Sequence, residues 1–492
     1  MGSKYLLGFA LLVVATFGGV VVACFSKRLR DLFFVGMILL APMTENYDIN
    51  FMSRDFYRGT TRGIEISLVD VLAISILVSS ILFPRQGQRR MFWPASFGLM
   101  LIFFGYCCFN VGIADPQIFG VFELSKMIRG MTIFLATAFF VQSEREIKLL
   151  LFALGLIICL EGVQGFRQRY RYGMERVPGT LDDSNSLSVF LVTTAPLFIA
   201  AINSRIPVWL KLLSAATIGA ACLTIILTVS RAGVVVMLAM LVLTTLITIS
   251  WRVTAQKVIC TVLIVGTAGA VAAKSWNSLV ARFKTFDVSQ EYKNKHNMGR
   301  GYYLRIARAI VDDRTFGVGL NNWSYVVSKQ YGPLLGYKFV PYKDAEHDPS
   351  RKNISGSNVD DPQAAPAHCL LALMAGELGW PGLVLFCFLW LRWFQMAISF
   401  LWKRTADPMR RIGVGILFGL CGLFLQSLTE WVFRHSPIYY TVHILLGVLA
   451  SLYYLKKKEA RALAMQPIEE EEPMQVFEPE IIVEPAPAPA GS

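Results

Sequence analysis

The first apolar run of the chain, Tyr5–Phe25, reads YLLGFALLVVATFGGVVVACF and contains no charged side chain. An α-helix rises 1.5 Å per residue, so about 20 apolar residues cross the hydrocarbon core of a bilayer, which is about 30 Å thick. Runs of similar character follow one another as far as Leu455. The sequence therefore predicts an all-α, polytopic membrane protein with about 12–13 transmembrane helices. The predicted spans are 5–25, 32–43, 66–83, 95–109, 119–141, 147–163, 187–202, 208–228, 233–250, 256–273, 367–402, 411–429 and 437–455.

The composition agrees with a membrane protein and excludes several other classes. Of 492 residues, 54% are hydrophobic and 16% are charged, whereas soluble domains contain about 25% charged residues. The net charge of +13 is assigned to loops at the membrane surface, not to a nucleic-acid interface. We therefore expect contacts with membrane lipids and no nucleic-acid partner.

The distribution of Lys and Arg predicts the orientation. With strictly alternating spans, one set of short loops carries twenty Lys and Arg residues and the other set carries nine. Because basic loops stay on the cytoplasmic side, the N-terminus and the segment 274–366 are predicted to face outside and the C-terminus to face the cytoplasm. The expected parts are N-terminal spans in 1–273, a large outer loop at 274–366, C-terminal spans in 367–458 and a disordered acidic, Pro/Ala-rich tail at 459–492.

The loop after the sixth span is the first candidate binding region. It includes Arg167 and Arg169 and leads through Gly179-Thr180 to Asn185. Arginines that oppose the positive-inside bias point to an anionic ligand such as a phosphate or an acidic sugar. Lipid headgroups or a solvated loop explain them equally well, and Asp183, Ser184 or Asn185 could simply cap the next helix.

Two further stretches place arginine at the face of the membrane that is predicted to lie outside. Ser230-Arg231-Ala232-Gly233 is a short turn between two apolar runs, where an arginine must either pair, snorkel to the surface or serve a function. The stretch Arg300–Asp313 has the pattern of an amphipathic helix with Arg305 on its basic side, followed by the turn Gly317-Val318-Gly319. This helix could lie on the membrane surface or face a diphosphate.

A single histidine opens the eleventh span. His368 precedes a long apolar stretch that Trp380-Pro381-Gly382 is predicted to break. Histidine can accept a proton from a hydroxyl near neutral pH, although a structural hydrogen bond to a backbone carbonyl is the alternative. Glu377 lies nine residues further on and on the opposite helix face, so it is not expected to pair with His368.

Taken in order, these motifs resemble the O-antigen ligase and polymerase superfamily. The pieces are Gly-Thr-x4-Asn, Ser-Arg-Ala-Gly, Arg-x16-Gly-Val-Gly and His-x2-Leu-x5-Glu-x-Gly-x2-Gly, and the resemblance covers roughly residues 120–450. It implies a bacterial inner-membrane enzyme with a GT-C-like fold that uses neither a metal nor a cofactor. Such an enzyme takes a glycan from undecaprenyl diphosphate and joins it to a saccharide or lipid-linked acceptor on the periplasmic face.

Carried over to this chain, the family pattern implies His368 as the catalytic base and Arg231 and Arg300 as ligands of the diphosphate. Two positions depart from the pattern. Cys369 stands where the family has Asn, and Leu304 stands where an aromatic residue is usual, which leaves the choice between Arg300 and Arg305 open. The alternative function is a membrane transporter or permease for an anionic solute, which would need ionisable residues deep in several spans.

Overall fold

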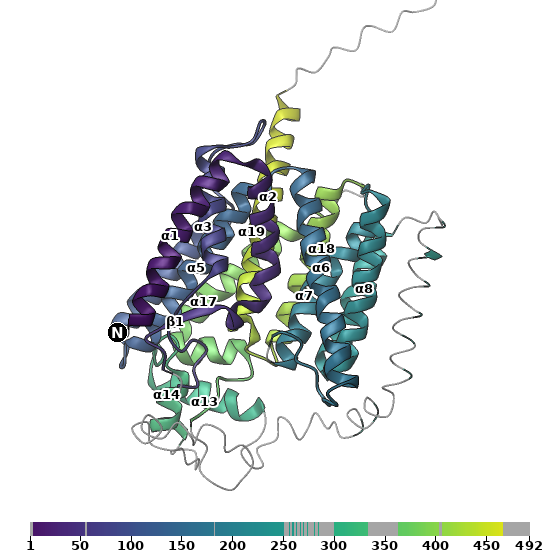
Figure 1. Ribbon diagram of the computed structural model, residues 1–492. Helices are drawn as coiled ribbons and strands as arrows, with labels where there is room; N and C mark the ends of the chain where they lie inside the picture. The colour runs from purple at the N-terminus through teal and green to yellow at the C-terminus, as the bar shows by residue number, and fades with distance from the viewer. Residues whose placement is uncertain are drawn as a thin grey trace, which may run out of the picture. The chain divides into compact units, whose positions relative to one another are not determined.

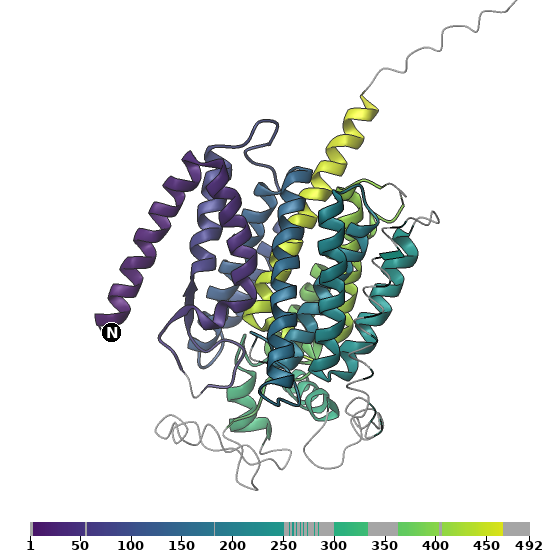
Figure 2. The ribbon, with the colours of Figure 1, turned by 45° about the vertical axis from the view of Figure 1, so that its right-hand side comes forward.

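The computed structural model describes residues 3–54, 57–181, 183–249, 300–332, 363–402 and 406–465, together with nine isolated positions between 255 and 284. The chain divides into two units, Met1–Tyr454 and Leu455–Ser492, and the account below concerns the first. Long helices running side by side form this unit (Figures 1 and 2). The helices are α1 (Ser3–Phe25), α2 (Lys27–Leu40), α3 (Leu68–Leu82), α4 (Phe97–Gly112), α5 (Ile118–Phe140), α6 (Glu144–Tyr170), α7 (Ser184–Ile202), α8 (Val208–Thr228), α9 (Arg231–Thr248), α17 (Leu370–Ile398), α18 (Pro408–Ser427) and α19 (Ser436–Ala464).

The predicted all-α, polytopic fold is confirmed. Twelve of the thirteen predicted spans coincide with helices, and the other, 256–273, lies outside the continuously described residues. Eight helices of the described part are long and apolar enough to cross a membrane, and α3 and α4 are shorter apolar helices. Helix α5 has the length of a span but carries Glu123, Lys126 and Arg129 on its buried side.

The helices pack into two neighbouring groups. Helix α7 packs against α18, α8 and α9, and α6 packs against α8. Helix α3 packs against α1, α2 and α5. Most of the buried side chains form one continuous apolar core, which runs through both groups. Helix α1 contributes little to this core, because nearly all of its described residues are exposed or only partly buried, and it lies at the edge of the bundle (Figure 2).

Shorter elements gather at one end of the bundle. The β-hairpin of β1 (Asp48–Phe51) and β2 (Ile64–Ser67) lies there, as do α13 (Arg300–Asp313) and α14 (Trp323–Val326), at the same end as the first residues of α1 (Figure 1). The short helices η1 (Ala41–Asn46), η2 (Val327–Tyr331) and η4 (Val432–Arg434) are further short elements of the described part. The expected amphipathic helix at 300–313 is thus present as α13, with Ile306 and Ile310 buried.

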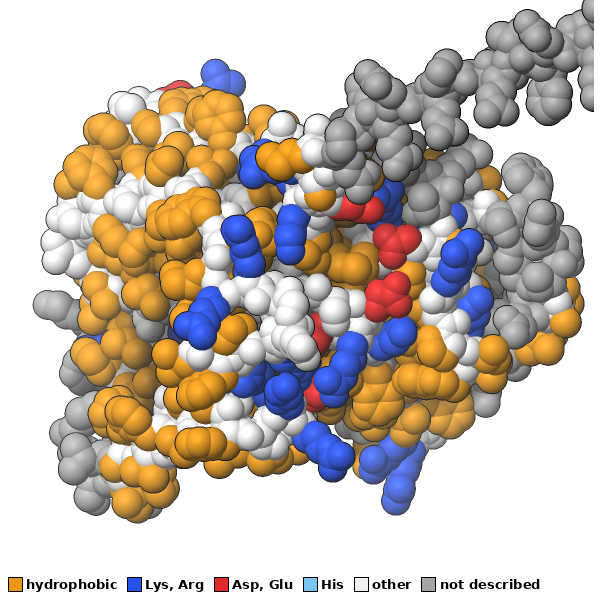
Figure 3. Space-filling model, turned by 90° about the horizontal axis from the view of Figure 1, so that it is seen from above, with side chains coloured by type: hydrophobic (Ala, Val, Ile, Leu, Met, Phe, Trp, Pro, Cys, Tyr) orange, Lys and Arg blue, Asp and Glu red, His pale blue; other side chains and the backbone are white. Residues whose placement is uncertain are grey.

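The opposite end of the bundle is rich in cations. Figure 3 looks onto this end and shows Lys and Arg side chains around a few carboxylates. Arg85 links the connections between the helices at this end. It forms an ion pair with the Asp31 carboxylate, and its Nη1 lies 2.7 Å from Glu146 Oε1. Arg145 reaches the same Asp31 carboxylate at 2.5 Å. The grouping of cations at this end matches the pattern on which the predicted orientation rests.

Helix α17 is broken in its N-terminal half, close to the predicted position. Gly379 has φ +67° and ψ −172°, and Pro381 follows two residues later. Proline has no N–H, so the carbonyl of Glu377 loses its helical partner, and the break at Gly379 frees the carbonyl of Gly376 in the same way. The turn after α13 repairs both losses, because Val318 N donates to Gly376 O and Gly319 N donates to Glu377 O, each at 2.9 Å.

Glycines allow this close contact between the turn and the break. A Cβ on Gly379 would collide with the carbonyl oxygen of Thr315, and one on Gly317 would collide with the backbone of Glu377. Asn110 of α4 fixes the same turn from the other side. Its Nδ2 donates to Phe316 O at 2.8 Å, and its Oδ1 accepts from Leu320 N at 2.7 Å. The Gly-Val-Gly and Glu-x-Gly motifs therefore fit against each other.

We expect Gly379→Ala to destabilise the protein by at least about 1–2 kcal/mol, because a side chain at positive φ is strained and its Cβ meets backbone. The matched control is Gly105→Ala in the interior of α4, where an added Cβ has open space around it. Thermal unfolding of both variants in the same detergent measures the difference. An unfolding temperature of Gly379→Ala equal to that of Gly105→Ala would contradict this account of the break.

Candidate active site

His368 forms a hydrogen-bonded pair with Glu430. The histidine lies two residues before the first residue of α17, and the glutamate lies in the connection between α18 and α19. His368 Nδ1 is 2.8 Å from Glu430 Oε2. A carboxylate only accepts hydrogen bonds, so Nδ1 carries the proton in this pair and Nε2 of the neutral ring carries the lone pair. The side chain of His368 is 38% exposed, so the ring remains accessible.

Two more side chains hold the Glu430 carboxylate. Asn185 Nδ2 donates to Glu430 Oε1 at 3.3 Å, and Arg300 Nη2 lies 3.6 Å from the same oxygen. The Nε of Arg300 also donates to the carbonyl of Thr429 at 3.1 Å. The beginnings of α7, α13 and α17 therefore meet at the α18–α19 connection. Three of the residues predicted from sequence, His368, Arg300 and Asn185, come together around Glu430.

The structure distinguishes Arg300 from Arg305. Arg300 is half-buried beside Glu430, whereas Arg305 is exposed on the outer side of α13. Helix α13 packs along α17, and the ring of Tyr303 lies 5.4 Å from the ring of His368. Arg300 and Tyr303, rather than Arg305, are thus the side chains that α13 places next to the His368–Glu430 pair.

Arg231 lies at the first position of α9. Its neighbour Ser230 caps the helix by accepting a hydrogen bond from Gly233 N at 3.4 Å. Gly233 packs so closely against Ser188 of α7 and Gln426 of α18 that a Cβ would collide with the serine hydroxyl. Ser188 is three residues after Asn185, and Gln426 is four residues before Glu430. The start of α9 therefore packs within about one turn of the residues that hold Glu430.

Arg167 and Arg169 have contacts of a different kind. Arg167 Nη2 donates to Tyr172 Oη at 3.3 Å, and Arg169 Nη1 donates to the carbonyls of Met174 and Glu175 at 3.1 and 2.8 Å. These bonds fold the loop after α6 onto itself, and the structure does not bring either side chain into contact with His368 or Glu430. Helix α7, which follows that loop, is capped by Asp183, whose carboxylate accepts from Ser186 N at 2.9 Å.

The sequence reasoning missed Glu430. Its only signal is that one glutamate, in Thr429-Glu430-Trp431, stands in a short connection with few charges. A second histidine, His435, lies further along the same connection. Its Nδ1 is 3.2 Å from Ser186 Oγ, one residue beyond Asn185. The predicted separation of His368 from Glu377 is confirmed, because Glu377 is buried and forms an ion pair with Arg434.

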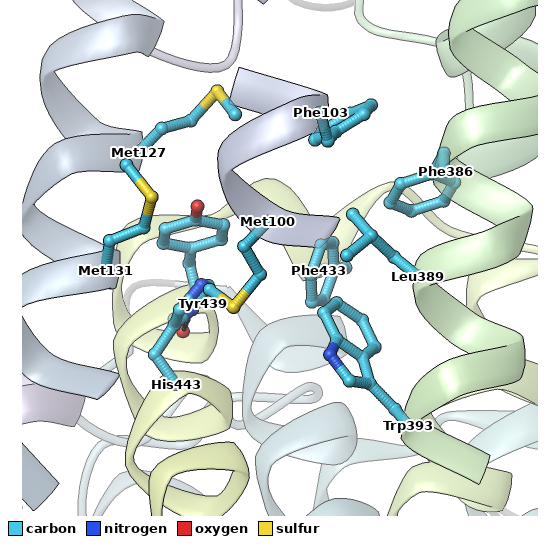
Figure 4. A pocket seen from close by; sticks show the side chains of 10 residues that line it. All are labelled: Met100, Phe103, Met127, Met131, Phe386, Leu389, Trp393, Phe433, Tyr439 and His443. Atoms are coloured by element: carbon cyan, nitrogen blue, oxygen red, sulfur yellow. Dashed lines mark hydrogen bonds between the residues drawn. The ribbon is translucent and has the colours of Figure 1, made fainter. Parts of the chain in front are cut away.

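An apolar pocket lies between α4, α5, α17 and α19. Figure 4 shows its lining, which includes five Phe, Trp and Tyr side chains and three methionines. His443 is its most polar member, and that ring is bonded through Nδ1 to Tyr439 O at 2.7 Å. None of His368, Glu430, Arg300 and Arg231 lines this pocket. The candidate site is therefore the His368–Glu430 pair and not this pocket.

Residues 215–387 match the O-Antigen ligase family. The predicted resemblance to the O-antigen ligase superfamily is confirmed. No curated protein matches the chain significantly. The residues matched to the ligase family include Arg231, Arg300 and His368 but end before Glu430. Together with the eight apolar helices, the match indicates a multi-pass bacterial membrane protein and supports glycosyl transfer of the ligase or polymerase kind with lipid-linked glycans.

Arg300→Ala and Arg305→Ala form a matched pair of variants on one helix. We expect Arg300→Ala to lower the rate of glycan transfer by about 10- to 1,000-fold, as for the loss of one group that stabilises developing charge. Arg305→Ala should stay within about threefold of the parent, because its side chain lies outside the site. Transfer of a carrier-linked glycan by the purified variants is the measurement. Equal losses of transfer rate in both variants would contradict the placement of Arg300, and not Arg305, at the site.

Proposed function

We propose that this protein transfers a glycan from undecaprenyl diphosphate to a sugar hydroxyl on the periplasmic side of the inner membrane. The observation that carries the proposal is the His368–Glu430 pair, in which a carboxylate orients a half-exposed imidazole with Nε2 as the acceptor. The family match supports glycosyl transfer in general. The roles of the individual residues, the donor and the orientation in the membrane are part of the proposal.

The proposed reaction forms one bond and breaks another at the anomeric carbon. The acceptor hydroxyl attacks this carbon while His368 Nε2 takes its proton, and the bond from the anomeric carbon to the diphosphate oxygen breaks. The resulting imidazolium is stabilised by the carboxylate of Glu430, which already holds the ring. Undecaprenyl diphosphate leaves with an additional negative charge.

Arginines are suited to hold this leaving group. A guanidinium offers a planar set of donors that matches two phosphate oxygens, and it stays protonated at every physiological pH. Arg231 and Arg300 are proposed as the two diphosphate ligands, because both begin helices that pack around the Glu430 connection. Fixed guanidinium groups stabilise the developing charge of the leaving group electrostatically.

The transporter alternative requires ionisable groups that face a solute path. The charged residues of α5 are instead paired with buried partners: Glu123 with Arg434, and Arg129 with Asp70. The broken helix α17 is a feature that transporters also use, but here the turn at Val318 and Gly319 satisfies the freed carbonyls. Both observations favour the enzyme.

His368→Ala should abolish transfer while leaving binding of the carrier-linked donor intact. Loss of a general base typically costs about 10²–10⁴-fold in rate. His435→Ala, at the other histidine of the outer end, should cost much less. More than about a tenth of the parent turnover in His368→Ala would rule out a base at this position.

Glu430→Gln tests the tautomer directly. The side-chain amide of Gln can donate a hydrogen bond to Nδ1 of His368, which favours the tautomer with the proton on Nε2. In that tautomer Nε2 cannot accept a proton, so the base is disabled. A similar change in a serine protease costs about 10⁴-fold in kcat. We expect kcat to fall by about 10²-fold or more and KM to change little, because the substrate does not contact this carboxylate in the proposed reaction. Steady-state kinetics of the purified variant provides the test. A raised KM with unchanged kcat would instead assign Glu430 to substrate binding.

A further inference from the structure

Four charged side chains are buried together next to the candidate site. Glu123 and Lys126 belong to α5, Glu377 to α17 and Arg434 to η4. Each of these four residues is at most 3% exposed. Arg434 Nε is 3.2 Å from Glu123 Oε1, and its Nη1 forms an ion pair with Glu377. Lys126 Nζ lies 2.9 Å from Glu123 Oε2 and donates to the carbonyl of Arg434 at 2.7 Å.

Arg434 joins the two segments that supply the His368–Glu430 pair. Arg434 is four residues after Glu430 in the α18–α19 connection, and Glu377 is nine residues after His368 in the outer part of α17. The neighbouring ring of Phe433 packs on the same helix, 5.9 Å from Trp390 and 6.4 Å from Trp393, and lines the apolar pocket of Figure 4. The α18–α19 connection is therefore held on α17 by the Arg434–Glu377 ion pair and by the aromatic packing of Phe433.

We propose that Arg434 is a positioning residue for glycan transfer, whose fork between Glu123 and Glu377 fixes the Glu430 connection against α17 and so keeps Glu430 on His368. This inference rests on the proposed function of the His368–Glu430 pair. A planar guanidinium can hold two carboxylates in fixed directions at once, which a lysine ammonium cannot. Burial alone would lower the pKa of Arg434, but the carboxylates of Glu123 and Glu377 raise it, so the side chain stays charged.

Arg129 provides a matched control on α5. It is also buried and also binds two carboxylates, with Nε 2.9 Å from Asp70 Oδ1 and Nη1 3.4 Å from Glu65 Oε2. Its guanidinium additionally lies over the ring of Tyr440, 4.8 Å from the ring centre. Asp70 and Glu65 belong to α3 and β2, which supply neither His368 nor Glu430. Arg129→Lys therefore removes a comparable buried fork whose two carboxylates lie outside the segments that supply His368 and Glu430.

The experiment compares Arg434→Lys with Arg129→Lys in the full-length protein. We expect Arg434→Lys to lower kcat by about 10- to 100-fold with KM within about twofold, because a small displacement of an orienting group costs that much in rate. Arg129→Lys should keep kcat within about threefold. A second readout needs no substrate: the Nδ1–H proton signal of His368 in ¹⁵N-histidine-labelled protein, identified by its loss in His368→Ala. It should shift or disappear in Arg434→Lys and persist in Arg129→Lys.

Glu377→Gln serves if Arg434→Lys does not fold, since it keeps an acceptor for Arg434 and removes only one charge. It should change the His368 signal in the same direction. An unchanged His368 signal in both variants, or equal changes in Arg434→Lys and Arg129→Lys, would overturn the inference. If the parent protein itself showed no glycan transfer but the His368 signal still shifted in Arg434→Lys, the proposed function would be overturned. The inference that Arg434 positions Glu430 on His368 would stand.

Discussion

A polar or charged group at membrane depth must find its partner inside the protein, because the hydrocarbon offers none. Much of this structure follows from that constraint. The carbonyls freed by the break in α17 are bonded by Val318 and Gly319, and the cations of α5 and η4 are each bonded to carboxylates. Apart from the Lys126–Glu123 pair within α5, these pairings join segments far apart in the chain. Satisfying the groups therefore also fixes how the short elements at this end sit on the bundle.

The same constraint explains why the candidate site lies where it does. Polar partners that could not be accommodated between apolar helix faces collect at the helix ends, where four segments meet around Glu430. An imidazole there is held by a carboxylate yet remains partly exposed. Deeper in the bundle, the pocket between α4, α5, α17 and α19 is almost wholly apolar. The fold thus separates this apolar pocket from the polar end of the bundle that holds the His368–Glu430 pair.

The sequence predicted the fold well because apolar length is a local property. Each span is visible in its own residues, and so is the break at Trp380-Pro381-Gly382. The approach of His368, Arg300 and Asn185 to one another was foreseen only through the order of family motifs. Glu430 and the burial of Arg434 were missed for a physical reason: each depends on a partner more than fifty residues away. In the sequence Arg434 is one cation in a short loop between two apolar runs, and a single-sequence pattern cannot distinguish such a cation from a buried one.

The departure at Cys369 now has a structural context. Cys369 occupies the cap position of α17 without a side-chain cap hydrogen bond, and it packs in a small apolar cluster with Leu373 and Ala372. A thiol behaves there as a small hydrophobic group and offers the histidine no strong hydrogen bond. The orientation of the His368 ring therefore depends on contacts from other segments, with Glu430 on one ring nitrogen and Tyr303 beside the ring. In a chain without an amide after the histidine, the α18–α19 connection becomes the main support of the proposed base, and whatever fixes that connection also fixes the base.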